Sequence, residues 1–182
     1  MMKDNNRTTI EVFRFMFGQV HEYIEATMAD VTETVARYEP GRPASILGQY
    51  AHLVSSEDWL INIKAGNNTP VMAQTNPGFQ NPPPPVGWDE WARTEAVDLV
   101  ALRAYAQEVY AATDAYLASV DDSCLNDPVD MSEMGFGMVP TTAIFMLALS
   151  NGCLHCGEIS AIKGFQGLPG YPAVAVPEAA RR

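Results

Sequence analysis

Hydrophobic positions recur every three or four residues in four stretches of the chain. Because side chains at this spacing share one face of an α-helix, the pattern predicts amphipathic helices. No stretch shows the alternation typical of a half-buried strand, and there is no internal repeat. Four long helices of this kind predict an all-α four-helix bundle that forms a single domain over residues 1–182. The predicted helices cover about residues 8–37, 44–65, 90–120 and 141–163.

Proline and glycine mark the connections between these helices. Residues 40–43 (Pro-Gly-Arg-Pro) separate the first helix from the second. Residues 66–88 are too rich in proline to be helical, since proline removes a backbone donor. They predict a long connection between helices two and three, and loops of this length are more often functional than idle. Residues 121–139 form a second long connection, and residues 167–182 are predicted to be an extended tail.

Composition and charge limit the kinds of molecule that this protein can be expected to bind. The formal net charge is −11, and the 11 basic residues are scattered along the chain. Nucleic acid is therefore excluded as a partner, because phosphate binding needs clustered Lys and Arg. The uncharged run from Met134 to Leu154 contains Pro140, glycines and hydroxyl residues, so it predicts a buried helix rather than a membrane span. The odd cysteine count and the absence of a signal sequence predict a cytoplasmic protein.

The candidate site lies at the end of this uncharged run. Asn151, His155 and Glu158 fall at i, i+4 and i+7, so a helix would place all three on one face. Burying polar groups without partners costs a few kcal/mol, which indicates that a metal, a substrate or a proton relay accounts for them. In a bundle, His52 on the second helix could meet His155 across the interior.

Two segments carry a family resemblance. They are His52-Leu-Val-Ser-Ser-Glu57-Asp-Trp59-Leu and Asn151-Gly-Cys-Leu-His155-Cys156-Gly157-Glu158. Together with the glycine-ended helix that follows, they resemble the second-helix and last-helix motifs of the DinB-like superfamily. The resemblance implies a DinB-like bundle with a histidine triad for zinc or nickel. It also implies an activity such as a thiol transferase that uses a low-molecular-weight thiol.

Carried onto this chain, the resemblance assigns His52 and His155 as metal ligands. Asn151 stands at the third ligand position, where the family has histidine, and Cys156 replaces the usual arginine. Three interpretations follow. A metal is retained with help from Glu158, or the site binds a polar small molecule without metal, or the polar face is a relic satisfied by internal hydrogen bonds.

The leading hypothesis is a metal-dependent small-molecule enzyme, a thiol transferase or hydrolase, with a degenerate triad of His52, Asn151 and His155. Glu158 or Glu57 is expected to orient a ligand imidazole or to move a proton. The alternative is a non-catalytic, metal-free bundle that binds a ligand or forms a homodimer through apolar helix faces.

Other residues with functional side chains have plainer interpretations. His21 matches no motif and is predicted to be structural or on the surface, and Cys153 and Cys156 to be small hydrophobic residues. Trp88 and Trp91 either anchor the proline-rich connection onto the bundle, or Trp88 walls a pocket over the site together with Phe79 and the prolines.

Overall fold

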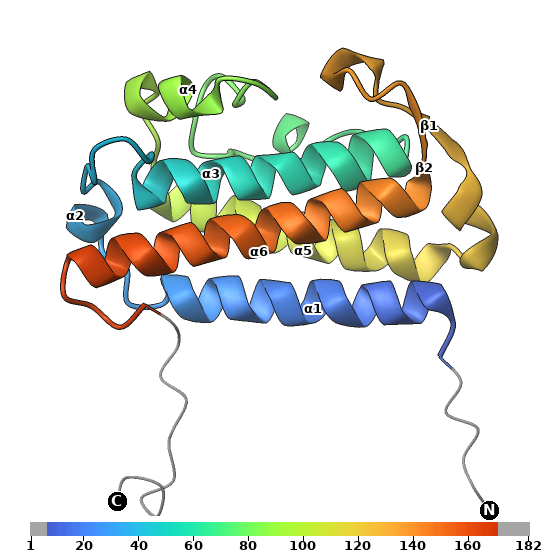
Figure 1. The fold of residues 1–182 in the computed structure, drawn as a ribbon, viewed down its shortest axis with the longest axis horizontal. Coiled ribbons are helices and arrows are strands. Elements are labelled where there is room, and N and C mark those ends of the chain that lie inside the picture. Colours follow the sequence, from blue (N-terminus) through green and yellow to red (C-terminus); the bar gives the residue numbers. More distant parts are fainter. Residues whose placement is uncertain (1–6, 171–182) are drawn as a thin grey trace, which may run out of the picture.

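The computed structural model describes residues 7–170 of the chain. Its four long helices run side by side along the molecule (Figure 1). The predicted all-α four-helix bundle is confirmed. The four helices are α1 (Thr9–Met28), α3 (Ile46–Glu57) with its π-helical continuation η1 (Asp58–Ala65), α5 (Leu99–Ser119) and α6 (Thr141–Phe165).

The prediction of one continuous helix over residues 8–37 is wrong. Thr8 and Glu11 form a capping box that starts α1, but α1 ends at Met28 and a separate short helix, α2 (Glu33–Ala36), follows. The Thr32 side chain accepts a hydrogen bond from the backbone of Val35, which begins a new helix. The chain can turn here because carbonyls at the end of α1, which have no donor within the helix, accept hydrogen bonds from side chains.

Those donors come from the other helices. Arg103 donates to the carbonyls of Met28 and Val31, and the buried Lys163 donates to the carbonyl of Thr27. Lys163 also forms an ion pair with Asp30. These contacts exist only in the folded bundle, so the local hydrophobic pattern could not indicate the end of α1.

The predicted helix over residues 90–120 is also divided. It consists of α4 (Trp88–Thr94) and α5, and Asp98 begins α5 by accepting hydrogen bonds from the backbone of Val100 and Ala101. The short helix α4 lies outside the bundle, over one end of α3 (Figure 1). The approach is close, because a Cβ atom on Gly48 would lie 2.5 Å from the Cβ atom of Ala92.

A small antiparallel ribbon, which the sequence did not predict, lies in the second connection. It pairs β1 (Pro128–Asp130) with β2 (Met138–Pro140), and Val129 is opposite Val139. Strands of three residues are too short to give an alternating pattern. Single-turn helices η2 (Val71–Ala73), η3 (Asp122–Asn126) and η4 (Ser132–Met134) complete the connections. Most of the predicted tail, residues 171–182, lies outside the described residues.

The bundle interior is mainly apolar. Aromatic side chains from α1, α3, α5 and α6 fill it, and they include Phe13, Tyr50, Tyr105 and Phe145. Among residues 7–170, no helix has both the length and the hydropathy that crossing a bilayer requires. The histidine pair described next lies where α3 packs against α6.

Candidate functional site

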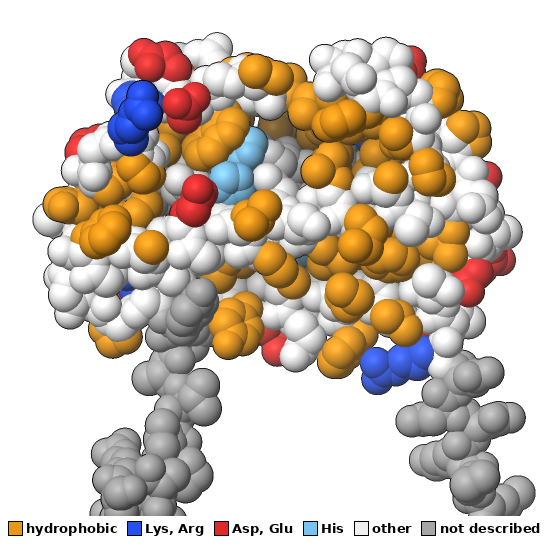
Figure 2. Space-filling model, in the orientation of Figure 1, with side chains coloured by type: hydrophobic (Ala, Val, Ile, Leu, Met, Phe, Trp, Pro, Cys, Tyr) orange, Lys and Arg blue, Asp and Glu red, His pale blue; other side chains and the backbone are white. Residues whose placement is uncertain are grey.

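The structure brings His52 of α3 and His155 of α6 together, as the sequence predicted. Their ring centroids are 4.8 Å apart, and the rings are nearly perpendicular at 87°. Histidine surface is visible at the edge of a hollow above the bundle (Figure 2). Two imidazoles from residues more than a hundred positions apart therefore form one site.

The hydrogen bonds of His155 fix its tautomer. Its Nδ1 atom is 2.6 Å from Oε1 of Gln49 and 2.6 Å from Oε2 of Glu158. Both oxygens are acceptors, so Nδ1 carries a proton and donates it. In the neutral ring, the lone pair then lies on Nε2, the nitrogen that can accept a proton or bind an electrophile. A carboxylate that orients an imidazole in this way is the arrangement found at general bases.

His52 is held uncharged at neutral pH. Its pKa is lowered to about 3, mainly by burial and also by the nearby His155, while a hydrogen bond to the Asn151 side chain opposes the shift. The side chain of Asn151 therefore contacts His52, on the same face of α6 as His155. The hydroxyl oxygen of Ser56 lies 3.4 Å from Nδ1 of His52.

An indole ring covers the two imidazoles. Trp88 stacks on His52, with 4.1 Å between ring centroids and 10° between planes, and meets His155 edge-on at 5.1 Å. Trp88 begins α4 directly after Gly87, whose φ of 77° favours glycine. Phe79, by contrast, is buried against Trp91 and Tyr105. Trp88 therefore lies over the site, whereas Phe79, which was expected to wall a pocket with it, packs into the core.

Glu57, the other predicted catalytic carboxylate, is placed elsewhere. Its carboxylate oxygens lie 2.9 and 3.0 Å from Nε2 of His21, and Thr113 donates a hydrogen bond to it at 2.7 Å. These partners come from α1 and α5, whereas the histidine pair lies between α3 and α6. The His21 ring also stacks on Tyr110 at 3.9 Å. Glu57 and His21 therefore form a separate polar contact inside the bundle.

The comparison with protein families agrees with the helical fold. Residues 16–159 match the model of the DinB superfamily. The chain belongs to the DinB superfamily. A solved structure, that of a conserved protein from Enterococcus faecalis, matches with a TM-score of 0.72 and 18% sequence identity. The match covers 87% of this chain and 96% of that one, and at this identity it shows the fold alone. No curated protein is similar enough in sequence to match.

The donor set of this DinB-superfamily chain does not fit a tightly held zinc or nickel ion. Zinc sites use imidazole, thiolate and carboxylate ligands. Here the third group beside the two imidazoles is the amide of Asn151, which is not one of these ligands. The carboxylate of Glu158 is directed at Nδ1 of His155 and not at Nε2, the nitrogen left to bind a metal. Cys156 is buried, with its thiol directed at Thr27. Within residues 7–170, no group of three or more His, Cys, Asp and Glu side chains is placed to hold a metal ion.

Sequence reasoning missed Gln49. Its side chain is 1% exposed, so packing fixes its amide against the imidazole of His155. A signal was present, because Gln49 precedes His52 by three residues and a helix places them on one face. A glutamine on the same face of an apolar helix as a candidate histidine needs a hydrogen-bond partner once it is buried, so Gln49 could have been predicted as a site residue.

Proposed function

We propose that this protein is a small-molecule enzyme in which Nε2 of His155 takes a proton from a nucleophile, either a thiol or a water. The observation that carries the proposal is the pairing of Nδ1 with both Gln49 and Glu158. Two acceptors on one nitrogen leave the other nitrogen basic and correctly oriented. DinB-superfamily membership supplies the bundle but not the chemistry.

The reaction would proceed as follows. The S–H or O–H proton moves to Nε2 of His155, and the carboxylate of Glu158 stabilises the imidazolium that forms. The sulfur or oxygen then bonds to an electrophilic carbon, and the leaving group departs with the proton from Nε2. A thiol nucleophile gives thiol transfer, and water gives hydrolysis. The uncharged His52 and the Asn151 amide supply hydrogen bonds for orienting the substrate, while Trp88 limits the access of water.

The test is hydrolysis of 4-nitrophenyl acetate and its thiolysis by 2-mercaptoethanol, measured with untagged protein. We expect His155→Ala to lower the protein-catalysed rate about a hundredfold, the usual contribution of a general base. Glu158→Gln should retain part of the rate, since Gln49 still accepts from Nδ1. Dialysis against a chelator should leave the rate unchanged, because the proposed step uses no metal.

Cys153→Ser is the matched control, because this exposed thiol on α6 could itself attack the ester. Its rate should equal that of the unchanged protein. Equal rates for His155→Ala and the unchanged protein would refute the general-base proposal. Loss of rate on chelation, restored by zinc or nickel, would instead favour the metal-dependent interpretation.

We also propose that the protein forms a homodimer. The support for this is the set of exposed apolar side chains on α1 and α6. Helices α1 and α6 pack together, and both expose large apolar side chains (Figure 2). Extended exposed apolar patches are rare on monomeric proteins and mark interaction surfaces. The α1–α6 face carries Val12, Phe15, Met16, Tyr23, Met146, Leu147 and Leu154.

A charge in this face should separate the subunits. Leu154 is 69% exposed, so Leu154→Glu should leave the fold intact. We expect the dimer dissociation constant to rise by about tenfold or more, because the substitution buries a carboxylate without a partner. Sedimentation equilibrium measures the change. Val100→Glu on α5, at 79% exposure, is the matched control and should have no effect. An unchanged protein that is strictly monomeric at micromolar concentration would contradict the proposal.

A further inference from the structure

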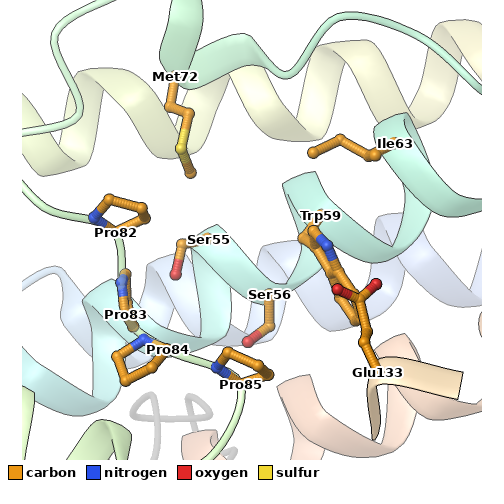
Figure 3. A pocket seen from close by; sticks show the side chains of 10 residues that line it. All are labelled: Ser55, Ser56, Trp59, Ile63, Met72, Pro82, Pro83, Pro84, Pro85 and Glu133. Carbon is orange, nitrogen blue, oxygen red and sulfur yellow. The ribbon is translucent and has the colours of Figure 1, made fainter. Parts of the chain in front are cut away.

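A pocket of about 230 Å³ lies beside the histidine pair. It is bounded by the proline segment Pro82–Pro85 on one side and by the end of α3 and the start of η1 on the other (Figure 3). In the space-filling view, the surface is hollowed between the part that carries α4 and the part that carries the β1–β2 ribbon (Figure 2). One wall of the pocket is thus formed by prolines, whose φ angles are restricted, and the other by helical residues.

The walls of this pocket are mainly apolar. Figure 3 shows the rings of Pro82–Pro85 opposite the indole of Trp59, with Met72 and Ile63 at one end. Ser55 and Ser56 form the floor. The Ser55 hydroxyl already donates to the carbonyl of Ala51, so it offers no free proton to a ligand. Flat indole and proline surfaces facing each other favour a flat apolar guest.

The pocket is connected to the histidine pair at Ser56. This residue lines the pocket, and its hydroxyl oxygen lies 3.4 Å from Nδ1 of His52. The proline segment also leads through Gly87 directly to Trp88, the residue that stacks on His52. A molecule held in the pocket would therefore have one end beside Ser56, next to His52.

The charges around the pocket disfavour an anion. The single charged residue that lines it is Glu133, and this carboxylate forms an ion pair with Lys64. The Lys64 ammonium also lies 5.0 Å from the centroid of the Trp59 ring. Lys64, the basic residue beside Glu133 and Trp59, is thus already paired, and Glu158 adds a further carboxylate at the histidine end. A carboxylate or phosphate on the ligand would find no free cation there.

We propose that this pocket holds the aromatic part of the substrate, and that the substrate is an uncharged aryl compound whose reactive carbon lies toward Ser56 and the histidine pair. An apolar cavity of about 150 Å³ in another protein is known to take up benzene. The larger pocket here has room for a benzene ring with a short substituent. The assignment as substrate rests on the proposed function, whereas binding itself does not.

The experiment compares three probes that share one ring: benzyl alcohol, benzoate and benzylammonium. Their affinities for untagged protein are measured by saturation-transfer NMR titration. We expect benzyl alcohol to bind at least about tenfold more tightly than benzoate, because benzoate would lose its hydration without gaining a cation. Benzylammonium should also bind less tightly than benzyl alcohol, since Glu133 is already paired with Lys64.

Two variants locate the binding. Ser56→Phe fills the pocket and should abolish binding of benzyl alcohol, while Ser119→Phe, at an exposed position on α5, should not. Glu133→Gln releases Lys64 and should narrow the gap between benzyl alcohol and benzoate. Circular dichroism checks that each variant is folded. Equal affinities for the three probes, or benzyl alcohol binding that survives Ser56→Phe, would overturn the proposal.

His155→Ala separates this inference from the proposed function. The variant should bind benzyl alcohol within about twofold of the unchanged protein, because His155 does not line the pocket. Retained binding together with unchanged ester hydrolysis would refute the general-base proposal alone. Lost binding in Ser56→Phe, with hydrolysis of 4-nitrophenyl acetate also reduced through a raised KM, would support both.

Discussion

Asn151→Lys or Asn151→Ala should leave the chain without bound zinc, whereas Asn151→His should bind zinc in a one-to-one ratio. The Asn151 side chain already contacts His52, and His155 lies on the same helix face one turn later. The substitution would give the site a third imidazole, which is the ligand number of catalytic zinc sites. The side-chain oxygens of Glu158 and Gln49 that contact Nδ1 of His155 would orient its ring toward the metal.

The expected gain in zinc affinity is about a hundredfold. Structural zinc sites with four ligands bind with about 10–16 kcal/mol, so one ligand accounts for about 3 kcal/mol. The gain is measured by competition with a chromophoric chelator and by elemental analysis of untagged protein. Ser150→His is the matched control, since it adds an imidazole at the neighbouring exposed position of α6. An equal gain from both substitutions would show that the added histidine binds zinc on the surface and not at the pair.

Asp58→Ala should destabilise the fold more than any other single carboxylate replacement in the described part of the chain. Asp58 is fully buried, and its carboxylate accepts four hydrogen bonds. Two come from side chains, Asn62 and Tyr105, and two from the backbone of Val71 and Met72. Asp58 thereby ties the start of the long connection to the bundle.

We expect a loss of about 4 kcal/mol in the free energy of unfolding, because two buried and two partly buried donors lose their carboxylate acceptor. Urea denaturation measures the loss. Tyr105→Phe removes one of the four bonds and should cost about 1 kcal/mol. Asp114→Ala is the control and should have far less effect, because its pair with Arg14 is exposed to solvent. A similar stability for Asp58→Ala and Asp114→Ala would contradict this account.

The same contact bears on function, because Met72 forms one end of the pocket. Loss of the Asp58 carboxylate would release the backbone of Met72, and with it that end of the pocket. Folded Asp58→Ala protein at low temperature should therefore bind benzyl alcohol less tightly than the unchanged protein.

Hydrophobic periodicity was a reliable guide to the bundle. Helical spacing depends on which residues lie three and four positions apart, so it can be read locally and survives packing. The same spacing predicted that Asn151 and His155 share a face of one helix, and the bundle then brought that face to His52. The predicted helix boundaries failed at residues 29–32 and 95–98, where Thr32 and Asp98 each begin a new helix inside an apolar pattern that continues.

The role of each carboxylate could not be read from spacing. Glu57 and Glu158 are both acidic residues near a candidate histidine in sequence, but only Glu158 contacts one of the pair. Glu57 instead lies against His21 and Thr113, two residues from other helices. Gln49 and Trp88, in contrast, do contact the histidine pair. Each contacts a histidine that is distant in sequence, so no short motif could indicate the contact.

The sequence by itself determined the helical bundle and its family, and it indicated that His52 and His155 could meet, because periodicity and short motifs lie within single helices. Only the tertiary structure decided which nitrogen of His155 is basic, which ring covers the pair and where an apolar molecule can bind. Each of these depends on groups from different helices and connections that approach one another only when the chain packs, and their positions are set by burial and hydrogen bonding across the interior.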